Sequence, residues 1–308
     1  MRFNRLDLNL LVALDALLTE RSVTRAALRL NLSPSATSDA LSRLRDYFGD
    51  DLLVQVGRRM EATPRAEALQ QAVRDVLVRV DSTIAMQPSF DPTQSDRSFK
   101  IFTSDYTQMV VCPLVMAAAA AQGSTVRFEF LPQVDNPQRD LERGEADLLV
   151  LPRPLMSSEH PHEVLYEERF VCVAWAGSEL AKGELSLERY LGAGHVIMRP
   201  QAVRAAAFED AFVKRMGVSR RIVATSYGFT PMPGLLVGTE LVATLHERLA
   251  RLMLPMWPLA VLPCPIAIPP MEQALQWHKY RSQDQGIAWL RGLFRQAGEV
   301  LARAVGSA

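Results

Sequence analysis

The chain has 308 residues, a hydrophobic fraction of 48%, and 34 basic side chains against 34 acidic ones. This length exceeds that of a usual single domain, so we expect two or three domains, each able to bury a core. The composition is that of an ordinary globular protein and does not indicate disorder, and the balanced charge gives no sign of a polyanionic partner, so any such partner must be argued from local features. Three widely spaced cysteines without a C-x-x-C pair argue against a disulfide framework or a zinc site, as expected for a reducing compartment.

The first expected element is an amphipathic helix. Leu6, Leu10, Leu14 and Leu17 recur at three- and four-residue spacing, which is typical of a helix with one apolar stripe. Acidic residues interrupt this stretch, and their charge argues against a signal peptide or a membrane span. We therefore expect a cytoplasmic protein.

Two short helices follow with a minimal turn between them. Ser22 is suited to cap the second helix, and Asn31 is suited to end it in the left-handed conformation. Ser33 followed by Pro34 predicts a new helix start, because serine caps free amides and proline fits the first turn. This third helix is expected to end near Phe48.

The third helix has one polar face built from small residues. Its apolar stripe is Thr37, Leu41, Leu44 and Phe48, so the serines and aspartates between them point away from the core. Two helices joined by a tight turn, the second with a small polar face, have the geometry of a helix-turn-helix.

A small wing and a long helix come next. Residues 52–56 and 58–62 are expected to pair as strands around Gly57, with arginines at the tip. Thr63 and Pro64 then open a long helix with apolar residues on one side. Such a helix requires a partner surface.

The pattern changes after a Pro- and Ser-rich linker at residues 87–98. Strands and helices then alternate, which predicts an α/β fold with a mostly parallel sheet, large enough for two lobes. The expected strands lie at residues 99–104, 126–132, 146–152, 169–175, 195–199, 221–226, 241–245 and 259–263, and helices at 113–121, 202–215 and 285–303.

Several stretches in this order resemble the LysR-type transcriptional regulators, and among them the NodD-like group. The resemblance rests on "RFNRLDLNLLVALDALLTERSVTRAA", "LLVQVGRRMEATP", "DPTQSDRSFKIFTSDYT", "LERGEADLLVLPRPLMSSEHP" and "EQALQWH". It implies an N-terminal all-α winged helix-turn-helix with a linker helix, and a C-terminal two-lobed effector domain of the periplasmic-binding-protein type. It also implies an activator that responds to a small aromatic or phenolic co-inducer.

The resemblance implies a division of the chain. Its expected parts are a DNA-binding domain at 1–63, a dimerisation helix at 64–88, a hinge at 89–96 and an effector domain at 97–308, with lobe I at about 97–164 and 266–303 and lobe II at about 165–265. The implied partners are double-stranded promoter DNA, the co-inducer, further copies of the chain in a dimer of dimers, and RNA polymerase. We expect no cofactor and no membrane partner.

The expected DNA contacts lie on the third helix and the wing. The residues are Pro34, Ser35, Thr37, Ser38, Asp39, Ser42, Arg58 and Arg59. Small hydroxyls in the first turns of a recognition helix can reach base edges or phosphates, and wing arginines suit phosphate or the minor groove. An ordinary exposed polar face is the alternative. Many family members carry arginine where this chain has Asp39, which can accept from cytosine but repels phosphate.

The expected effector contacts follow strands of the α/β region, where such folds bind ligands. The residues are Thr103, Ser104, Asp105, Tyr106, Thr107, Pro152, Arg153, His195, Phe229 and Thr230. For Ser104 and Asp105 the alternative is simple helix capping. For Arg153 it is a solvated loop, whereas an arginine in the cleft would suit an anionic or phenolic ligand.

Other functions have weaker support. His160 and His162 form a poor metal site, since no cysteine or spaced carboxylate set accompanies them. The chain lacks G-x-S-x-G, His-Glu-x-x-His and a phosphate-binding glycine loop, so we expect no enzyme. The alternatives are a binding or transport module whose N-terminal helices only oligomerise it, and a regulator that senses a non-aromatic organic acid.

Overall fold

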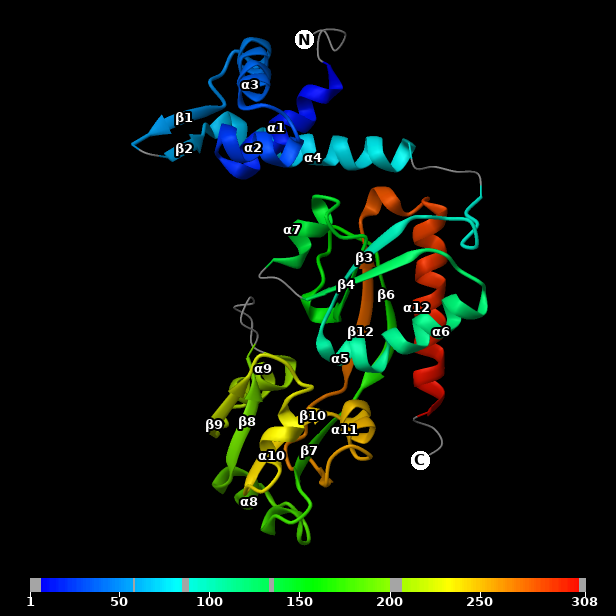
Figure 1. Cartoon of the computed structure of the whole chain (residues 1–308). Helices are drawn as coiled ribbons and strands as arrows, with labels where there is room; N and C mark the ends of the chain where they lie inside the picture. Colours follow the sequence, from blue (N-terminus) through cyan, green and yellow to red (C-terminus); the bar gives the residue numbers. More distant parts are fainter. Residues whose placement is uncertain (1–6, 58, 85–88, 133–135, 200–206, 305–308) are drawn as a thin grey trace. The chain divides into compact units, whose positions relative to one another are not determined.

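The computed structural model describes residues 7–57, 59–84, 89–132, 136–199 and 207–304 (Figure 1). The chain divides into two compact units, residues Met1–Met86 and Gln87–Ala308. Within the described ranges, no helix is both long and apolar enough to cross a membrane.

The first unit is a winged helix-turn-helix followed by a long helix. Its elements are α1 (Leu8–Glu20), α2 (Val23–Leu30), α3 (Pro34–Phe48), β1 (Leu53–Val56), β2 (Arg59–Ala62) and α4 (Pro64–Ile84). The expected helices, wing and long helix are confirmed. Leu14, Leu17 and Leu44 are fully buried at the centre of one core that includes all four helices.

The apolar stripe of α4 is divided between two surfaces. Val73 is buried in the core of the first unit, and Leu69 and Leu77 pack against that core. Arg74 fixes this side to α1 by an ion pair of 2.7 Å with Asp15. Ala68, Ala72, Val76 and Ile84 stay exposed, so half of the expected stripe has no partner within the unit.

The second unit contains two five-stranded sheets with helices packed on them. The first sheet has the order β4-β3-β5-β12-β6, and the second has the order β11-β7-β10-β8-β9. The first sheet and its helices are β3 (Ser98–Thr103), α5 (Asp105–Val110), α6 (Cys112–Ala121), β4 (Arg127–Pro132), α7 (Pro137–Glu142), β5 (Leu148–Pro152), β6 (His162–Glu168), β12 (Met271–Trp277) and α12 (Gln285–Ala304). The second sheet and its helices are β7 (Phe170–Trp175), α8 (Leu187–Gly192), β8 (Gly194–Met198), α9 (Phe208–Arg215), β9 (Arg221–Ser226), α10 (Met232–Leu236), β10 (Leu241–His246), α11 (Glu247–Met253) and β11 (Leu259–Pro263).

The expectation of a mostly parallel sheet is wrong. Two strand pairs in each sheet are parallel and two are antiparallel. The chain leaves the first sheet after β6 and returns to it as β12, which runs antiparallel between β5 and β6. The sequence analysis did not identify β6 and β12, because charged or amide residues occupy many of their positions. The expected helix at 202–215 begins at Phe208, and its first five positions lie outside the described residues.

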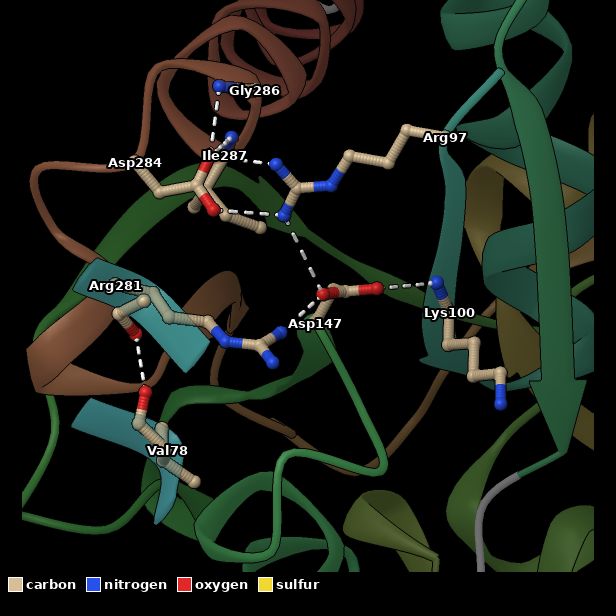
Figure 2. Close-up of polar contacts among 9 residues, drawn as sticks. Val78, Arg97, Lys100, Asp147, Arg281, Asp284, Gly286 and Ile287 are labelled. Carbon is tan, nitrogen blue, oxygen red and sulfur yellow. Dashed lines mark hydrogen bonds and ion pairs between the residues drawn. The ribbon is translucent and has the colours of Figure 1, made fainter. Parts of the chain in front are cut away.

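A network of ion pairs attaches α12 to the first sheet (Figure 2). Arg97 donates to both carboxylate oxygens of Asp284, at 2.7 and 2.8 Å. Asp284 also accepts from the amides of Gly286 and Ile287, which begin α12. Burial alone would raise the pKa of Asp284, but the hydrogen bonds and charge of Arg97 lower it below its usual value. The charged side chain thus caps α12 and fixes the amino end of β3 beside it.

Candidate functional site

Serine and asparagine caps set the corner between α2 and α3. The Ser22 hydroxyl accepts from the Arg25 amide, and Asn31 ends α2 with a φ of 53°. The Ser33 hydroxyl accepts from the Ala36 amide at 3.1 Å, and Pro34 occupies the first turn. These features confirm the predicted helix boundaries. The boundaries could be predicted because every one of these contacts is local in sequence.

The outer face of α3 presents most of the expected DNA contacts to solvent. The exposed members are Pro34, Ser35, Ser38, Asp39 and Ser42. The expectation for Thr37 is wrong, since this side chain is fully buried and its hydroxyl donates to the Ser33 carbonyl at 3.1 Å. Thr37 belongs to the apolar stripe of α3, which faces the core, so its side chain is buried and does not reach the exposed face.

The wing is braced by contacts that the sequence analysis missed. Arg45 donates to the carbonyls of Asp51 and Leu53 at 2.8 and 2.7 Å. Asp50 accepts from the Thr63 hydroxyl at 2.6 Å, and this hydrogen bond lowers the pKa of the carboxyl. These contacts connect both ends of the hairpin to the end of α3.

The tip of the hairpin turns at a glycine. Gly57 has a φ of 62°, a conformation that glycine adopts without strain. Arg59 begins β2 and is exposed, whereas Arg58 lies outside the described residues.

In the second unit, the carboxyl end of β3 leads directly into α5. Ser104 caps this helix, and its hydroxyl accepts from the Thr107 amide at 3.2 Å. The capping alternative is therefore confirmed for Ser104. The Thr103 side chain is fully buried at the last position of β3.

Asp105 connects the two lobes. Its Oδ2 atom accepts from the amide and the hydroxyl of Thr230, at 2.8 and 3.0 Å. Gly228 makes this approach possible, because a Cβ atom there would lie 2.5 Å from the same oxygen. Two residues expected at the effector site thus meet each other across the lobes.

Tyr106 lies in a second, buried contact between the lobes. Its ring stacks on His246 with centroids 3.9 Å apart, and the edge of Phe229 packs against that imidazole at 4.5 Å. Burial lowers the pKa of His246 to about 3, so the ring is neutral. The Tyr106 hydroxyl donates to the Glu168 carboxylate, which is itself fully buried.

Glu168 holds this junction together. Arg248 forms an ion pair with Glu168 at 3.2 Å and lies over the Tyr166 ring. Burial raises the pKa of Glu168, although Tyr106 and Arg248 partly oppose the shift. None of Tyr166, Glu168 and Arg248 was predicted, since no local motif marks them.

Two buried oxygen atoms near the end of β3 have no hydrogen-bond partner. Gln273 of β12 donates from Nε2 to the Thr107 hydroxyl at 3.0 Å, while its Oε1 atom has no partner. The Thr103 hydroxyl also lacks one. Buried polar atoms are nearly always paired in native proteins, so these two atoms are available to a ligand or a water molecule. Gln273 lies within the quoted stretch "EQALQWH", but its role was not predicted.

Pro152 and Arg153 follow β5 as expected. Pro152 pairs with Gln273 in the register of the first sheet. Arg153 is half exposed and forms an ion pair of 2.8 Å with Glu272. Its guanidinium charge is therefore already matched by a carboxylate.

The expectation for His195 is wrong. This residue lies at the amino end of β8, is fully buried, and shares a hydrogen bond of 2.8 Å between its Nε2 atom and the Tyr190 carbonyl. Burial lowers its pKa to about 4. The ligand-binding edge of a parallel sheet is at the carboxyl ends, so His195 lies at the opposite end of its strand.

The paired histidines near β6 do not converge. His160 is buried, whereas His162 is exposed at the start of β6. In the part of the chain that the structure describes, no group of three or more metal-ligating side chains could hold an ion.

Comparison with known proteins gives the family. Residues 8–67 match "Bacterial regulatory helix-turn-helix protein, lysR family", and residues 92–299 match "LysR substrate binding domain". The chain belongs to the LysR family. It is accordingly a DNA-binding transcriptional regulator of the LysR type, with an effector-binding domain.

Its relatives include two nodulation proteins. The chain is 42% identical over 296 residues to Nodulation protein D 1 of Rhizobium leguminosarum bv. phaseoli, covering 96% of this chain and 94% of the relative. It is 40% identical over 301 residues to Nodulation protein D 2 of Rhizobium tropici, covering 98% and 96%.

Solved LysR-type structures share the fold. A probable transcriptional regulator from Pseudomonas aeruginosa is 29% identical with a TM-score of 0.64, covering 95% of this chain and 97% of that one. Full-length BenM is 17% identical with a TM-score of 0.54, covering 94% and 96%, and this likeness concerns the fold alone. The α3 face and the end of β3 are thus the candidate DNA and effector sites of a LysR-type regulator.

Proposed function

We propose that this protein is a cytoplasmic transcriptional activator that responds to a neutral aromatic or phenolic effector. The observation that carries the effector proposal is the pair of partnerless buried oxygens, Thr103 Oγ1 and Gln273 Oε1. The similarity to the nodulation proteins supports the proposal at the level of the whole chain. The protein acts by binding DNA and effector, without a catalytic step.

The hydrogen-bond pattern favours a ligand that donates a proton. Because the Nε2 atom of Gln273 already donates to Thr107, its free Oε1 atom can only accept. The Thr103 hydroxyl can donate or accept, so a phenolic hydroxyl is a suitable partner for either atom. The nearby cations Arg153 and Arg248 are engaged with Glu272 and Glu168. A carboxylate ligand would therefore lack a matched charge, whereas a neutral phenol would not need one.

The effector acts by shifting the equilibrium between conformations of the protein. Asp105 and Thr230 join the lobes by hydrogen bonds, and Tyr106 and His246 join them by ring stacking. A ligand beside these contacts changes the balance between lobe arrangements by its difference in affinity for them. The arrangement of the subunits, and with it the bend of the DNA, follows that balance.

DNA binding and self-association are assigned to the first 88 residues. The polar face of α3 reads the major groove, Arg58 and Arg59 of the wing contact phosphate or the minor groove, and α4 pairs two subunits. The exposed Val76 and Ile84 of α4 support such pairing, because the first unit leaves them uncovered. We retain residues 1–63 as DNA-binding domain, 64–88 as dimerisation helix, 89–96 as hinge and 97–308 as effector domain. A dimer of dimers that contacts RNA polymerase completes the proposal.

The first experiment is a thermal-shift screen of the full-length protein. Its compounds are neutral phenols and flavonoids, matched benzoates and salicylates, and non-aromatic acids. A ligand present at about 100 times its dissociation constant adds roughly 2.7 kcal/mol of stability. We expect phenols to stabilise the wild type and to lose this effect in Gln273→Leu. Stabilisation by non-aromatic acids alone would overturn the aromatic assignment.

Footprinting on promoter DNA then tests the mechanism. The bound phenol should change the length of the footprint or the bend of the DNA in the wild type. Ser38→Arg should change DNA binding without changing the thermal shift, since this residue lies on the exposed face of α3. A ligand that binds yet leaves footprint and bend unchanged would contradict the population shift.

A further inference from the structure

One acidic side chain lies in the middle of the polar face of α3. From Pro34 to Ser42 the sequence of this helix contains a single charged residue, Asp39. Its side chain is exposed, whereas Thr37, Leu41 and Leu44 bury the other side of the helix. At 3.6 residues per turn Asp39 lies opposite this buried stripe, so its carboxylate faces away from the core.

The cations of α3 are directed elsewhere. Arg43 follows Asp39 at the four-residue spacing of a helical ion pair, but its guanidinium lies 4.0 Å from the carboxylate of Asp7. Arg45 donates to two carbonyls of the wing. Within the described residues, no hydrogen bond or ion pair engages the Asp39 carboxylate. The charge is therefore available to a partner outside the chain.

The neighbours of Asp39 on this face are short. Ser35 and Ser42 lie one turn before and after it, and Ala36 lies beside Ser35. The Ser35 hydroxyl shares a hydrogen bond of 2.9 Å with the Ser33 hydroxyl, so it is turned toward the cap of the helix. Asp39 has the longest exposed side chain between Ser35 and Ser42. In a groove that this face enters, its carboxylate reaches furthest toward the bases.

A carboxylate inside DNA requires a hydrogen-bond donor. An ionised carboxylate only accepts hydrogen bonds, and the phosphates repel it. In the major groove, guanine presents two acceptors, and thymine presents an acceptor and a methyl group. Adenine presents its amino group beside the N7 acceptor, which repels a carboxylate. Cytosine presents its N4 amino group alone, so it is the base whose edge best suits Asp39.

We propose that Asp39 selects a cytosine in each DNA half-site, by accepting a hydrogen bond from the N4 amino group in the major groove. This inference rests on the proposed role of α3 as the recognition helix, and it adds the base that one position of the helix reads. Opposite any other base the charge stays unpaired among phosphates, so Asp39 acts mainly by rejecting wrong sequences. Two subunits related by twofold symmetry would place one such cytosine in each half-site.

Selection from randomised double-stranded DNA with the full-length protein tests the inference. Fluorescence anisotropy then measures binding to the selected site and to its single base-pair variants. We expect one cytosine in each half-site whose replacement weakens binding about tenfold or more. Asp39→Ala should remove this discrimination and keep the preferences at the other positions. Asp39→Asn should move the preference at this position from cytosine to adenine, because an amide can pair with both N6 and N7.

Asp46→Ala is the matched control. It removes the same charge from an exposed position two turns further along the same face, about 10 Å from Asp39. This variant should keep the cytosine preference. If Asp39→Ala also keeps it and only strengthens binding to all sequences alike, the inference is overturned, while the role of α3 stands. A wild-type selection without any preferred sequence would overturn the proposed reading of DNA by α3 as well.

Discussion

Within the DNA-binding unit and within the effector unit, the contacts that build the candidate sites have very different ranges in sequence. At the turn before α3, the Ser33 hydroxyl binds an amide three residues away. At the end of β3, Asp105 binds Thr230 across 125 residues of sequence, and Thr107 binds Gln273 across 166. The first site is therefore specified by local chemistry, whereas the second exists only once both sheets have formed.

The largest expected effect tests the long-range side of this comparison. Glu168→Ala removes the shared acceptor of Arg248 and the Tyr106 hydroxyl, and leaves the arginine buried without its charge partner. Loss of one partner of a buried ion pair costs about 3–5 kcal/mol. Chemical denaturation followed by tryptophan fluorescence measures this change.

A surface pair provides the control for Glu168. Glu299→Ala removes the 3.6 Å partner of Arg303, and both of these side chains are mostly exposed. Its effect should stay below about 1 kcal/mol. Equal losses in the two variants would show that the lobe junction does not depend on Glu168.

The next effect is a dependence on pH. Burial raises the pKa of Glu209 in α9 from 4.5 to about 7, although the charge of Arg220 opposes the shift. Since the folded state binds this proton more tightly than the unfolded state, the free energy of unfolding should fall by about 2–3 kcal/mol as pH rises from about 4.5 to about 7. Glu209→Gln should flatten this part of the stability curve. An unchanged pH profile in the variant would exclude Glu209 as the titrating group.

A smaller effect concerns the close approach of the lobes. In Gly228→Ala the new Cβ atom would lie 2.5 Å from the Asp105 carboxylate, so the contact with Thr230 must open. Overpacking of this kind costs about 1–3 kcal/mol. Differential scanning calorimetry should show a lower melting temperature, and hydrogen exchange should show faster exchange of the Thr230 amide. Gly192→Ala is the control, because no atom lies within 4 Å of its added Cβ and it should leave both measurements unchanged.

The smallest effect tests the local side of the comparison. Ser33→Ala removes the cap of α3 and should cost about 1 kcal/mol of stability. Ser38→Ala, on the exposed face of the same helix, should leave stability unchanged and weaken only DNA binding. Urea denaturation and fluorescence anisotropy with labelled DNA separate the two outcomes. A stable Ser33→Ala protein with normal DNA affinity would show that the corner does not need its local cap.

The errors in the sequence predictions follow the same division by range. Thr37 was placed both in the apolar stripe and at the DNA surface, and burial of the stripe decides between them. His195 was expected at the effector site, but the strand presents its carboxyl end, not its amino end, to that site. The mixed sheets were not expected, because strand direction depends on where the chain re-enters a sheet.

The sequence by itself determined the helix-turn-helix, the wing, the long helix and most strands of the α/β unit. Caps, proline positions and apolar spacing act over a few residues, so their consequences can be read before the fold is known. Only the tertiary structure decided which polar atoms lack partners at the end of β3 and which residues connect the lobes. Those contacts join segments about 60 to 170 residues apart in the sequence. No local sequence pattern predicts them, because they form only when the two sheets pack on a common core.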